Sequence, residues 1–313
     1  MAKINGVGGE LDTADLGLTL SHEHLVVGRE EVRFQFPHLY DADNEFNRAL
    51  VQVRLAQKRG VKTVFDPSVL GLGRDVRFMA RVADQTGLQI VAATGAYTHG
   101  DLPAPLASRP IEQVAELFVR DLTEGIQGTS IKAGFLKCAI DHDGMTAGVE
   151  KAMRAVALAH RATGAPIMVH TSPSNRSGET VQELLSSEGV ALDRVVIAHS
   201  GDTDELDYLE RIAEQGSFLG MDRYGLDDVL STERRNGAVI EMCRRGYSKQ
   251  LMLSQDHPCT YDRYQPEVSA QRANWNWVHV FDNVIPKLLD GGVTDEQVTQ
   301  MMVDNPRRWI ERR

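Results

Sequence analysis

The sequence is short of cysteine and has no long apolar run, and each shortage excludes a class of protein. Three cysteines, Cys138, Cys243 and Cys259, lie far apart in 313 residues. An odd, scattered set argues against a disulfide framework and favours a reducing compartment. We expect all three thiols to be buried as small apolar side chains. No window approaches 18 uninterrupted apolar residues, and no charged leader with an apolar core opens the sequence, so we expect a cytoplasmic protein.

Basic charge is also scarce. Lysine and arginine total 34 against 44 aspartate and glutamate residues, which gives a formal net charge of -10. Basic runs interleaved with aromatic residues are missing as well. This composition argues against nucleic acid or an anionic membrane as a partner and favours a small, modestly polar molecule.

The length and the 42% hydrophobic content suit either two ordinary domains or one large α/β barrel. No low-complexity linker or change of composition marks a boundary. We therefore predict one domain over residues 1–313. Two segments, 98–110 and 257–274, are too long for simple turns and are candidate active-site loops.

Short β-branched or apolar runs alternate with segments of helical period along the whole chain. The eight predicted strands end near His24, Asp66, Thr94, Lys137, His170, His199, Asp222 and Asp256. Predicted helices cover 44–59, 111–125, 149–163, 179–187, 204–214 and 232–245, with two more after Trp277. Alternation of this kind implies parallel strands joined by helical crossovers.

Eight such units close most simply into a (β/α)8 TIM barrel, and a doubly wound open sheet is the second choice. The barrel is favoured because its carboxyl-terminal face gathers all eight strand ends, with their polar residues, around one cavity. An open sheet gives no reason for ligand-type residues at nearly every strand end.

Several of these polar residues are typical metal ligands. His22 and His24 are two apart, so on a strand they project from one face while Glu23 points away. His170, His199 and Asp256 end other strands, where imidazole packs poorly but binds metal well. The spacing predicts a metal centre at the carboxyl-terminal face of the barrel.

Lys137 is the unexpected member of this set, because an ammonium group is repelled by divalent cations. Within a metal pocket it must be neutral, ion-paired or converted into an anion. Reaction with carbon dioxide gives a carbamate, N6-carboxylysine, whose two oxygens can bridge two metal ions. An unmodified Lys137 paired at the barrel rim is the alternative.

Motifs along nearly the whole chain support this interpretation: residues 17–24, 132–138, 169–171, 197–204, 220–225 and 304–308. With these motifs the sequence resembles the phosphotriesterase family of the amidohydrolase superfamily, and within it the phosphotriesterase-like lactonases. The resemblance implies two divalent ions, with zinc expected and iron, cobalt or manganese as alternatives. It assigns the more buried ion to His22, His24 and Asp256, the more exposed ion to His170 and His199, and a bridging role to Lys137 and a hydroxide.

The same resemblance implies a substrate. Phosphotriesterases have a histidine where this chain has Arg223, as the lactonase branch does, and arginine accepts no proton at working pH. Tyr97 matches a lactonase position beside the exposed metal. Asp202 is expected to hold Arg223 or to take a proton onward from Asp256. We therefore expect attack of the bridging hydroxide on a lactone, N-acyl homoserine or another γ- or δ-lactone, with weak phosphotriesterase activity.

Several alternatives stay open. The same site suits a true phosphotriesterase or a carboxylesterase, and a metal-bearing barrel that only binds a ligand is the non-enzymatic hypothesis. Arg223 and Tyr97 have simpler interpretations, as a rim salt bridge and a loop packing residue. The loop after Asp256 departs from the lactonases: Asp262 and Arg263 either pair and leave an apolar channel, or shorten it and favour small or polar lactones.

The remaining residues receive structural roles. Asp66 is a hydrogen-bonding support at the barrel mouth, and His257 a loop or supporting residue rather than a ligand. Trp275 and Trp277 can pack at a subunit contact, because the resemblance implies a homodimer. We expect the histidines outside strand ends to lie on the surface or in loops and to bind no metal: His38, His99, His142, His160 and His279.

Overall fold

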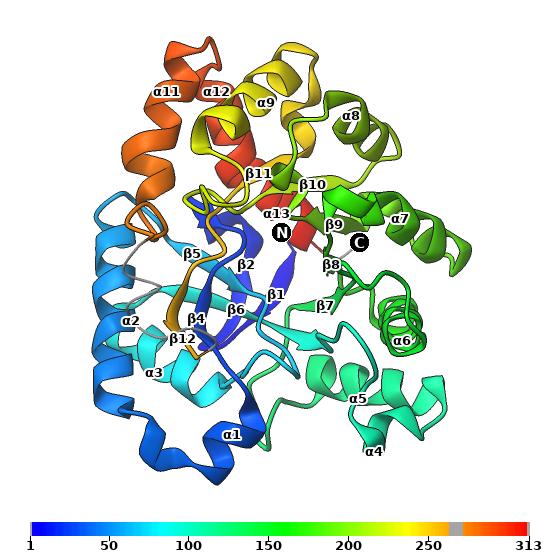
Figure 1. Cartoon of the computed structure of the whole chain (residues 1–313). Helices are drawn as coiled ribbons and strands as arrows, with labels where there is room; N and C mark the ends of the chain where they lie inside the picture. Colours follow the sequence, from blue (N-terminus) through cyan, green and yellow to red (C-terminus); the bar gives the residue numbers. More distant parts are fainter. Residues whose placement is uncertain (1, 263–271, 312–313) are drawn as a thin grey trace.

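The computed structural model describes residues 2–262 and 272–311, and its centre is a sheet of eight parallel strands (Figure 1). The strands pair in chain order: β3 (Thr19–Leu20), β5 (Thr63–Asp66), β6 (Gln89–Gly95), β7 (Phe135–Ala139), β8 (Ile167–His170), β9 (Val195–Ala198), β10 (Phe218–Met221) and β11 (Leu251–Leu253). The order never reverses, which excludes the doubly wound sheet. The predicted (β/α)8 barrel is confirmed.

The barrel closes between its first and last strands. Beyond β3 the chain continues as β4 (His24–Val27), and beyond β11 as β12 (Pro258–Tyr261), and these continuations pair in parallel. Between the two halves of each strand, the Asp256 amide donates to the His22 carbonyl at 3.0 Å. His22 and Asp256 therefore lie at breaks in the strands that form the seam.

Helices surround the barrel, and α13 crosses behind it in Figure 1. The helices are α1 (Glu30–Gln35), α2 (Ala42–Gln57), α3 (Val76–Thr86), α4 (Ala104–Ala107), α5 (Ile111–Thr123), α6 (Ala147–Thr163), α7 (Ser177–Ser187), α8 (Leu206–Glu214), α9 (Thr232–Arg244), α11 (Ile285–Asp290), α12 (Asp295–Thr299) and α13 (Asn305–Ile310). π-Helical segments at Val280–Val284 and Gln300–Asp304 adjoin α11, α12 and α13. Side chains cap several of the α-helices. At the start of α6, for example, the Thr146 side chain accepts a hydrogen bond from the Val149 amide.

Strand alternation separates two apolar layers. Outward residues such as Leu136 pack under the helices, while inward residues such as Phe135 fill the barrel. At the base, Trp309 of α13 lies 5.7 Å from the Phe65 ring and 5.4 Å from the Phe135 ring, centroid to centroid. Lys137 lies two residues after Phe135, and alternate side chains of a strand share a face. Lys137 therefore also points inward, into the cavity above the packed core.

The structure differs from the predicted elements in several places. A hairpin of β1 (Lys3–Gly6) and β2 (Gly9–Asp12), and helix α3, were not among the expected elements. His22 stands outside the strands, because the chain breaks between β3 and β4. The loop segments also carry structure, with α4 inside 98–110 and β12 inside 257–274.

Asp262, which we considered as a partner of Arg263, pairs with a residue of α1. Its carboxylate accepts from Arg33 Nη1 at 2.8 Å, and Arg33 also reaches Glu45. Arg263 and the rest of the chain as far as residue 271 lie outside the described residues. The segment after β12 is thus anchored to α1 and α2 through Asp262.

Trp275 and Trp277 are not at an exposed face, which corrects their expected place at a subunit contact. The two residues are 8% and 0% exposed, and their indole nitrogens donate to the carbonyls of Gln255 and His257. The indoles therefore brace the chain that follows Asp256. Within the described ranges, no helix has the length and apolar character needed to cross a membrane, and the three cysteines are buried free thiols, as expected.

Candidate metal centre

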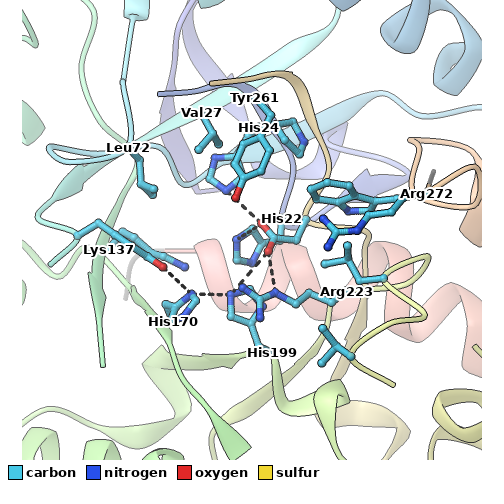
Figure 2. A pocket seen from close by; sticks show the side chains of 16 residues that line it. His22, His24, Val27, Leu72, Lys137, His170, His199, Arg223, Tyr261 and Arg272 are labelled. Carbon is cyan, nitrogen blue, oxygen red and sulfur yellow. Dashed lines mark hydrogen bonds and ion pairs between the residues drawn. The ribbon is translucent and has the colours of Figure 1, made fainter. Parts of the chain in front are cut away.

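A cavity of about 190 Å³ opens at the carboxyl-terminal ends of the strands (Figure 2). The structure brings seven of the predicted metal-site and substrate-site residues and the supporting Arg223 to its wall: His22, His24, Tyr97, Lys137, His170, His199, Arg223 and Asp256. Asp202 is the predicted residue that does not reach the cavity, since it lies behind Arg223.

Each of the four histidines turns one ring nitrogen inward. His22 Nε2 and His24 Nε2 lie 3.3 and 3.2 Å from Asp256 Oδ1. His199 Nε2 lies 3.8 Å from Asp256 Oδ2 and 2.8 Å from His170 Nδ1. Four imidazole nitrogens and a carboxylate thus converge on one small space, as metal ligands do.

The outward nitrogen of each histidine contacts an oxygen atom. Asp222 joins two rings, with Oδ2 2.8 Å from His22 Nδ1 and Oδ1 2.9 Å from His199 Nδ1. His24 Nδ1 lies 2.7 Å from Ser68 Oγ. These partners fix ring orientation and leave the inward nitrogen free to bind a cation.

Asp66 supports His24 indirectly. Its carboxylate accepts from the Leu25 amide at 3.0 Å and from the Ser68 amide at 2.9 Å, and it lies 3.6 Å from His24 Nδ1. For Asp222, unlike Asp66, the sequence analysis predicted a position at a strand end but no supporting role. A polar residue two positions after inward Gly220 is the signal that would have identified it.

Two of the predicted ligands have unusual backbone conformations. His199 and Asp256 have φ values of 66° and 51°, in the left-handed region that side chains with a Cβ rarely occupy. Strain of this kind is retained where surrounding contacts over-determine it. It turns both side chains over the barrel mouth, and sequence periodicity carries no sign of it.

Lys137 is 1% exposed, and its Nζ atom has no hydrogen-bond partner among the described residues. Burial lowers the pKa of its amine to about 8, against the opposing charges of Asp256 and Asp222. No carboxylate pairs with it at the rim within the described ranges, so the rim salt bridge is not observed. In the described part of the chain, this buried amine beside four imidazoles therefore has unsatisfied hydrogen-bonding capacity.

Glu23 is a structural residue that sequence reasoning underestimated. It points away from the cavity as expected, but it is fully buried. Its Oε1 accepts from the Ser254 hydroxyl and from the backbone and side chain of Gln255, and its Oε2 accepts from the His257 amide. Burial raises its pKa to about 8. Glu23 therefore fixes the chain on both sides of Asp256 relative to the two histidines.

Arg223 links two carboxylates. Its Nε donates to Asp256 Oδ2 at 2.9 Å and its Nη1 to Asp202 Oδ2 at 3.0 Å. Fully buried Arg235 holds the other oxygen of Asp202 at 2.8 Å. Burial opposes the charged form of Arg223, but Asp202 and Asp256 outweigh it and raise the Arg223 pKa above its usual value. Arg223 is therefore a permanent cation.

The remaining wall combines aromatic, aliphatic and charged groups. The Tyr97 hydroxyl lies 3.5 Å from His170 Nδ1. The cavity is also lined by Val27, Leu72, Leu226, Val229, Tyr261 and Trp275, and by Arg272, which pairs with Asp228. His257 does not line this cavity, in agreement with its expected supporting place.

The five histidines expected on the surface or in loops differ in their surroundings. His38, His99 and His142 are in loops or short turns, whereas His160 is on α6. His279 is 3% exposed and lies between Thr232 and Asn283, so its surface assignment was wrong. The packing of the segment after Trp277 against α9 buries it.

The residues present fit a cation. Ligand atoms of His22, His199 and Asp256 lie within 4.8 Å of one another. This triad takes one histidine from each of the two predicted ligand sets, so the division of ligands between two ions stays a prediction. The buried Lys137 side chain and the inward nitrogens of His24 and His170 supply further positions.

Comparison with known proteins gives one consistent result. The model of the phosphotriesterase family matches residues 2–310. An aryldialkylphosphatase of Saccharolobus solfataricus is 43% identical over 96% of both chains, and a phosphotriesterase homology protein of Mycobacterium tuberculosis is 44% identical over 100% of this chain and 98% of that one. The solved phosphotriesterase from Mycobacterium tuberculosis superposes with a TM-score of 0.95, covering 99% and 98% of the two chains at 44% identity. The chain therefore belongs to the phosphotriesterase family and is a hydrolase.

Proposed function

We propose that this hydrolase is a metal-dependent lactonase that opens small γ- and δ-lactones, including N-acyl homoserine lactones with short side chains, and has weak phosphotriesterase activity. The observation that carries the proposal is the hydrogen bond from Arg223 Nε to Asp256 Oδ2 at 2.9 Å. A guanidinium accepts no proton, so a proton collected by Asp256 has no exit through Arg223. It remains available to the leaving group.

This retention of the proton distinguishes the candidate substrates. A lactone releases a strongly basic alkoxide that stays tethered to the product and must be protonated. An aryl phosphotriester releases a weakly basic phenolate that departs without a proton. Asp256, held between His22, His24 and Arg223, is placed to take a proton from the attacking water and return it to the alkoxide.

The family consists of binuclear metal-dependent hydrolases, and the ligand set proposed here is His22, His24, Lys137, His170, His199 and Asp256. When bound, two divalent cations polarise the substrate oxygen and lower the pKa of a coordinated water so that it attacks near neutral pH. Histidine and carboxylate ligands favour zinc, with iron, cobalt or manganese as alternatives.

Lys137 takes part in this proposal as a carbamate. Its Nζ is buried and has no hydrogen-bond partner among residues 2–262 and 272–311, and an ammonium group there would face the two cations directly. As N6-carboxylysine it supplies an anion with two oxygens at the same point. Two cations carry about four positive charges, which this anion and Asp256 reduce to about two.

The chain's other residues position the substrate. The Tyr97 hydroxyl, beside His170, is placed to donate to the carbonyl oxygen as negative charge develops there. Arg223 orients Asp256, and Asp202 and Arg235 hold Arg223 in turn. Replacement of Tyr97 would weaken stabilisation of the substrate oxygen, and replacement of Arg223 or its partners would disturb the position of Asp256.

The cavity supports small substrates. About 190 Å³ accommodates a lactone ring with a short substituent, against walls from Leu72, Leu226 and Trp275. Arg272 adds a cation at the edge of this wall. These features support the short or polar alternative for the acyl portion.

The second candidate is an aryldialkylphosphatase, favoured by the name of the Saccharolobus solfataricus relative; a carboxylesterase on the same site is a variant of it. The homodimer and the cytoplasmic location also remain proposals. Light scattering of the purified protein tests the dimer.

The deciding experiment is a panel of homoserine, γ- and δ-lactones, a linear carboxylic ester and a paraoxon-type ester, assayed with one metal-loaded preparation. We expect the highest kcat/KM for a lactone. A higher kcat/KM for the paraoxon-type ester would establish the second candidate instead. Turnover of none of them by metal-replete protein would favour a binding protein.

A further inference from the structure

A carboxylate outside the predicted ligand set lies on the outer side of His170. Asp141 follows β7, two residues after its end, and its side chain is 21% exposed. Its Oδ2 lies 3.0 Å from His170 Nε2 and 3.5 Å from His99 Nδ1, and its Oδ1 lies 3.5 Å from His142 Nε2. Three imidazoles from three loops or strands therefore surround one carboxylate.

The position of Asp141 matters because His170 is oriented differently from the other three histidines. His22, His24 and His199 turn Nε2 inward and Nδ1 outward. His170 turns Nδ1 inward, where it lies 2.8 Å from His199 Nε2, and Nε2 outward to Asp141. The reversed ring needs an acceptor of its own on the outside.

We propose that Asp141 is the positioning residue for His170: it accepts the Nε2 hydrogen, holds the ring in the tautomer whose Nδ1 lone pair faces the cavity, and so sets retention of the metal ion bound through His170. The inference rests on the proposed metal centre. It adds a member that the ligand motifs did not reveal.

The two anchoring carboxylates differ in how firmly they are held. Asp222 is 1% exposed and is fixed by two rings and by the His199 amide at 2.8 Å. Asp141 is partly open to solvent, and its further contacts are the His142 amide at 2.9 Å, the half-buried imidazole of His99 and the exposed imidazole of His142. The ion that depends on His170 is therefore the more easily lost of the two.

The loop that carries Asp141 is itself anchored near His170. The Ile140 amide donates to the His170 carbonyl at 2.9 Å, and Asn175 Nδ2 donates to the Asp141 carbonyl at 3.0 Å. Backbone contacts of this kind persist when the carboxylate is removed. A variant at Asp141 thus changes the bond to His170 with little disturbance of the loop.

The test measures metal retention without substrate. Wild-type protein, Asp141→Ala, Asp141→Asn and the control Asp143→Asn are loaded with cobalt(II), passed into chelator, and followed by metal analysis and by the visible absorption spectrum of cobalt. Asp143 is an exposed carboxylate two residues along the same loop. Asp141→Asn keeps an acceptor of the same shape and provides a folded variant should Asp141→Ala fail to fold.

We expect Asp141→Ala to lose one of two ions about ten- to a hundredfold faster than wild type, with a changed cobalt spectrum, because removal of such partners weakens metal binding by that factor. Asp141→Asn should lie between the two, and Asp143→Asn should match wild type. Equal loss rates in wild type and both Asp141 variants would overturn the inference. Failure of the lactone assay alone would leave this result unchanged, whereas wild-type protein that retains fewer than two ions would contradict the metal centre and the inference together.

Discussion

Arg223 and Asp256 form an ion pair at the edge of the cavity, Nε to Oδ2 at 2.9 Å, with Asp202 on the far side of the same guanidinium. Asp256 thereby faces histidine nitrogens on one side and a permanent cation on the other. Burial favours the protonated carboxyl, but His22, His199 and the further neighbours outweigh it and hold the pKa of Asp256 well below its usual value. The residue is therefore held as an anion.

Replacement of Arg223 by leucine should therefore damage both catalysis and stability. The change leaves Asp202 and Asp256 without their shared partner, and loss of one member of a buried ion pair costs about 3 to 5 kcal/mol. We expect kcat/KM for lactones to fall at least about tenfold and the free energy of unfolding to decrease. Urea denaturation and steady-state kinetics measure the two effects.

The matched control is Arg234→Leu, which removes an exposed arginine from its pair with Asp204. An exposed pair contributes at most about 1 kcal/mol, and this one is outside the cavity. Equal losses in the two variants would show that Arg223 has no special place in the reaction.

Lys137 offers a chemical test. Intact-mass analysis of native protein should show one chain heavier by one carbon dioxide. Lys137→Met, which keeps the buried volume without a charge, should fold but retain fewer metal ions and lose nearly all turnover. A short carboxylic acid should partly restore Lys137→Ala, because its carboxylate occupies the place of the carbamate. Full activity of the methionine variant would contradict the bridging role.

The base of the barrel provides a stability prediction that leaves the metal centre aside. Trp309 is fully buried against Phe65 and Phe135. Trp309→Ala should lower the free energy of unfolding by about 3 to 5 kcal/mol, through lost burial and the cavity left behind. Phe34→Ala, at a side chain that is 82% exposed, should change it by no more than about 0.5 kcal/mol. Similar values for both would contradict the assignment of Trp309 to the core.

Much of this architecture follows from the sequence. The alternation of apolar runs and helical segments is enough to predict the barrel. The strands are recognisable as continuous apolar runs because their inward and outward side chains both pack in apolar layers. Lys137 and His170 were placed correctly because they continue the inward faces of Phe135 and Met168. Trp309 shows the limit: its packing across the barrel base is a long-range contact with no local pattern.

The candidate site was predicted less completely. His22, His199 and Asp256 were identified by residue type, but the strand breaks and left-handed backbone that aim them were not. Asp141 and Glu23 were missed for another reason. Each acts through a neighbour, so residue type alone gives it no role: Glu23 lies between His22 and His24, and Asp141 lies three residues beyond the 132–138 motif.

Surface charge adds a prediction about pH. Hydrogen bonds from Arg244 and Arg245 lower the pKa of Glu241 to about 2, from an ordinary value of 4.5. Because the folded-state pKa is depressed, the stabilisation is present above pH 4.5 and is lost as the pH falls toward 2. Glu241→Gln should be slightly less stable than wild type at pH 7, and the difference should disappear near pH 2. A difference that stays constant from pH 7 to pH 2, followed by urea denaturation, would contradict this pairing.

The central claim is that a metal pair in this cavity opens lactones, and the most direct measurement is lactone turnover during metal restoration. Chelator-treated protein is titrated with zinc while kcat/KM is recorded for a δ-lactone and a paraoxon-type ester. We predict negligible turnover at first, a rise that levels off at two ions per chain, and a higher final value for the lactone. Turnover that survives metal removal, or a final value that is higher for the ester, would contradict the account.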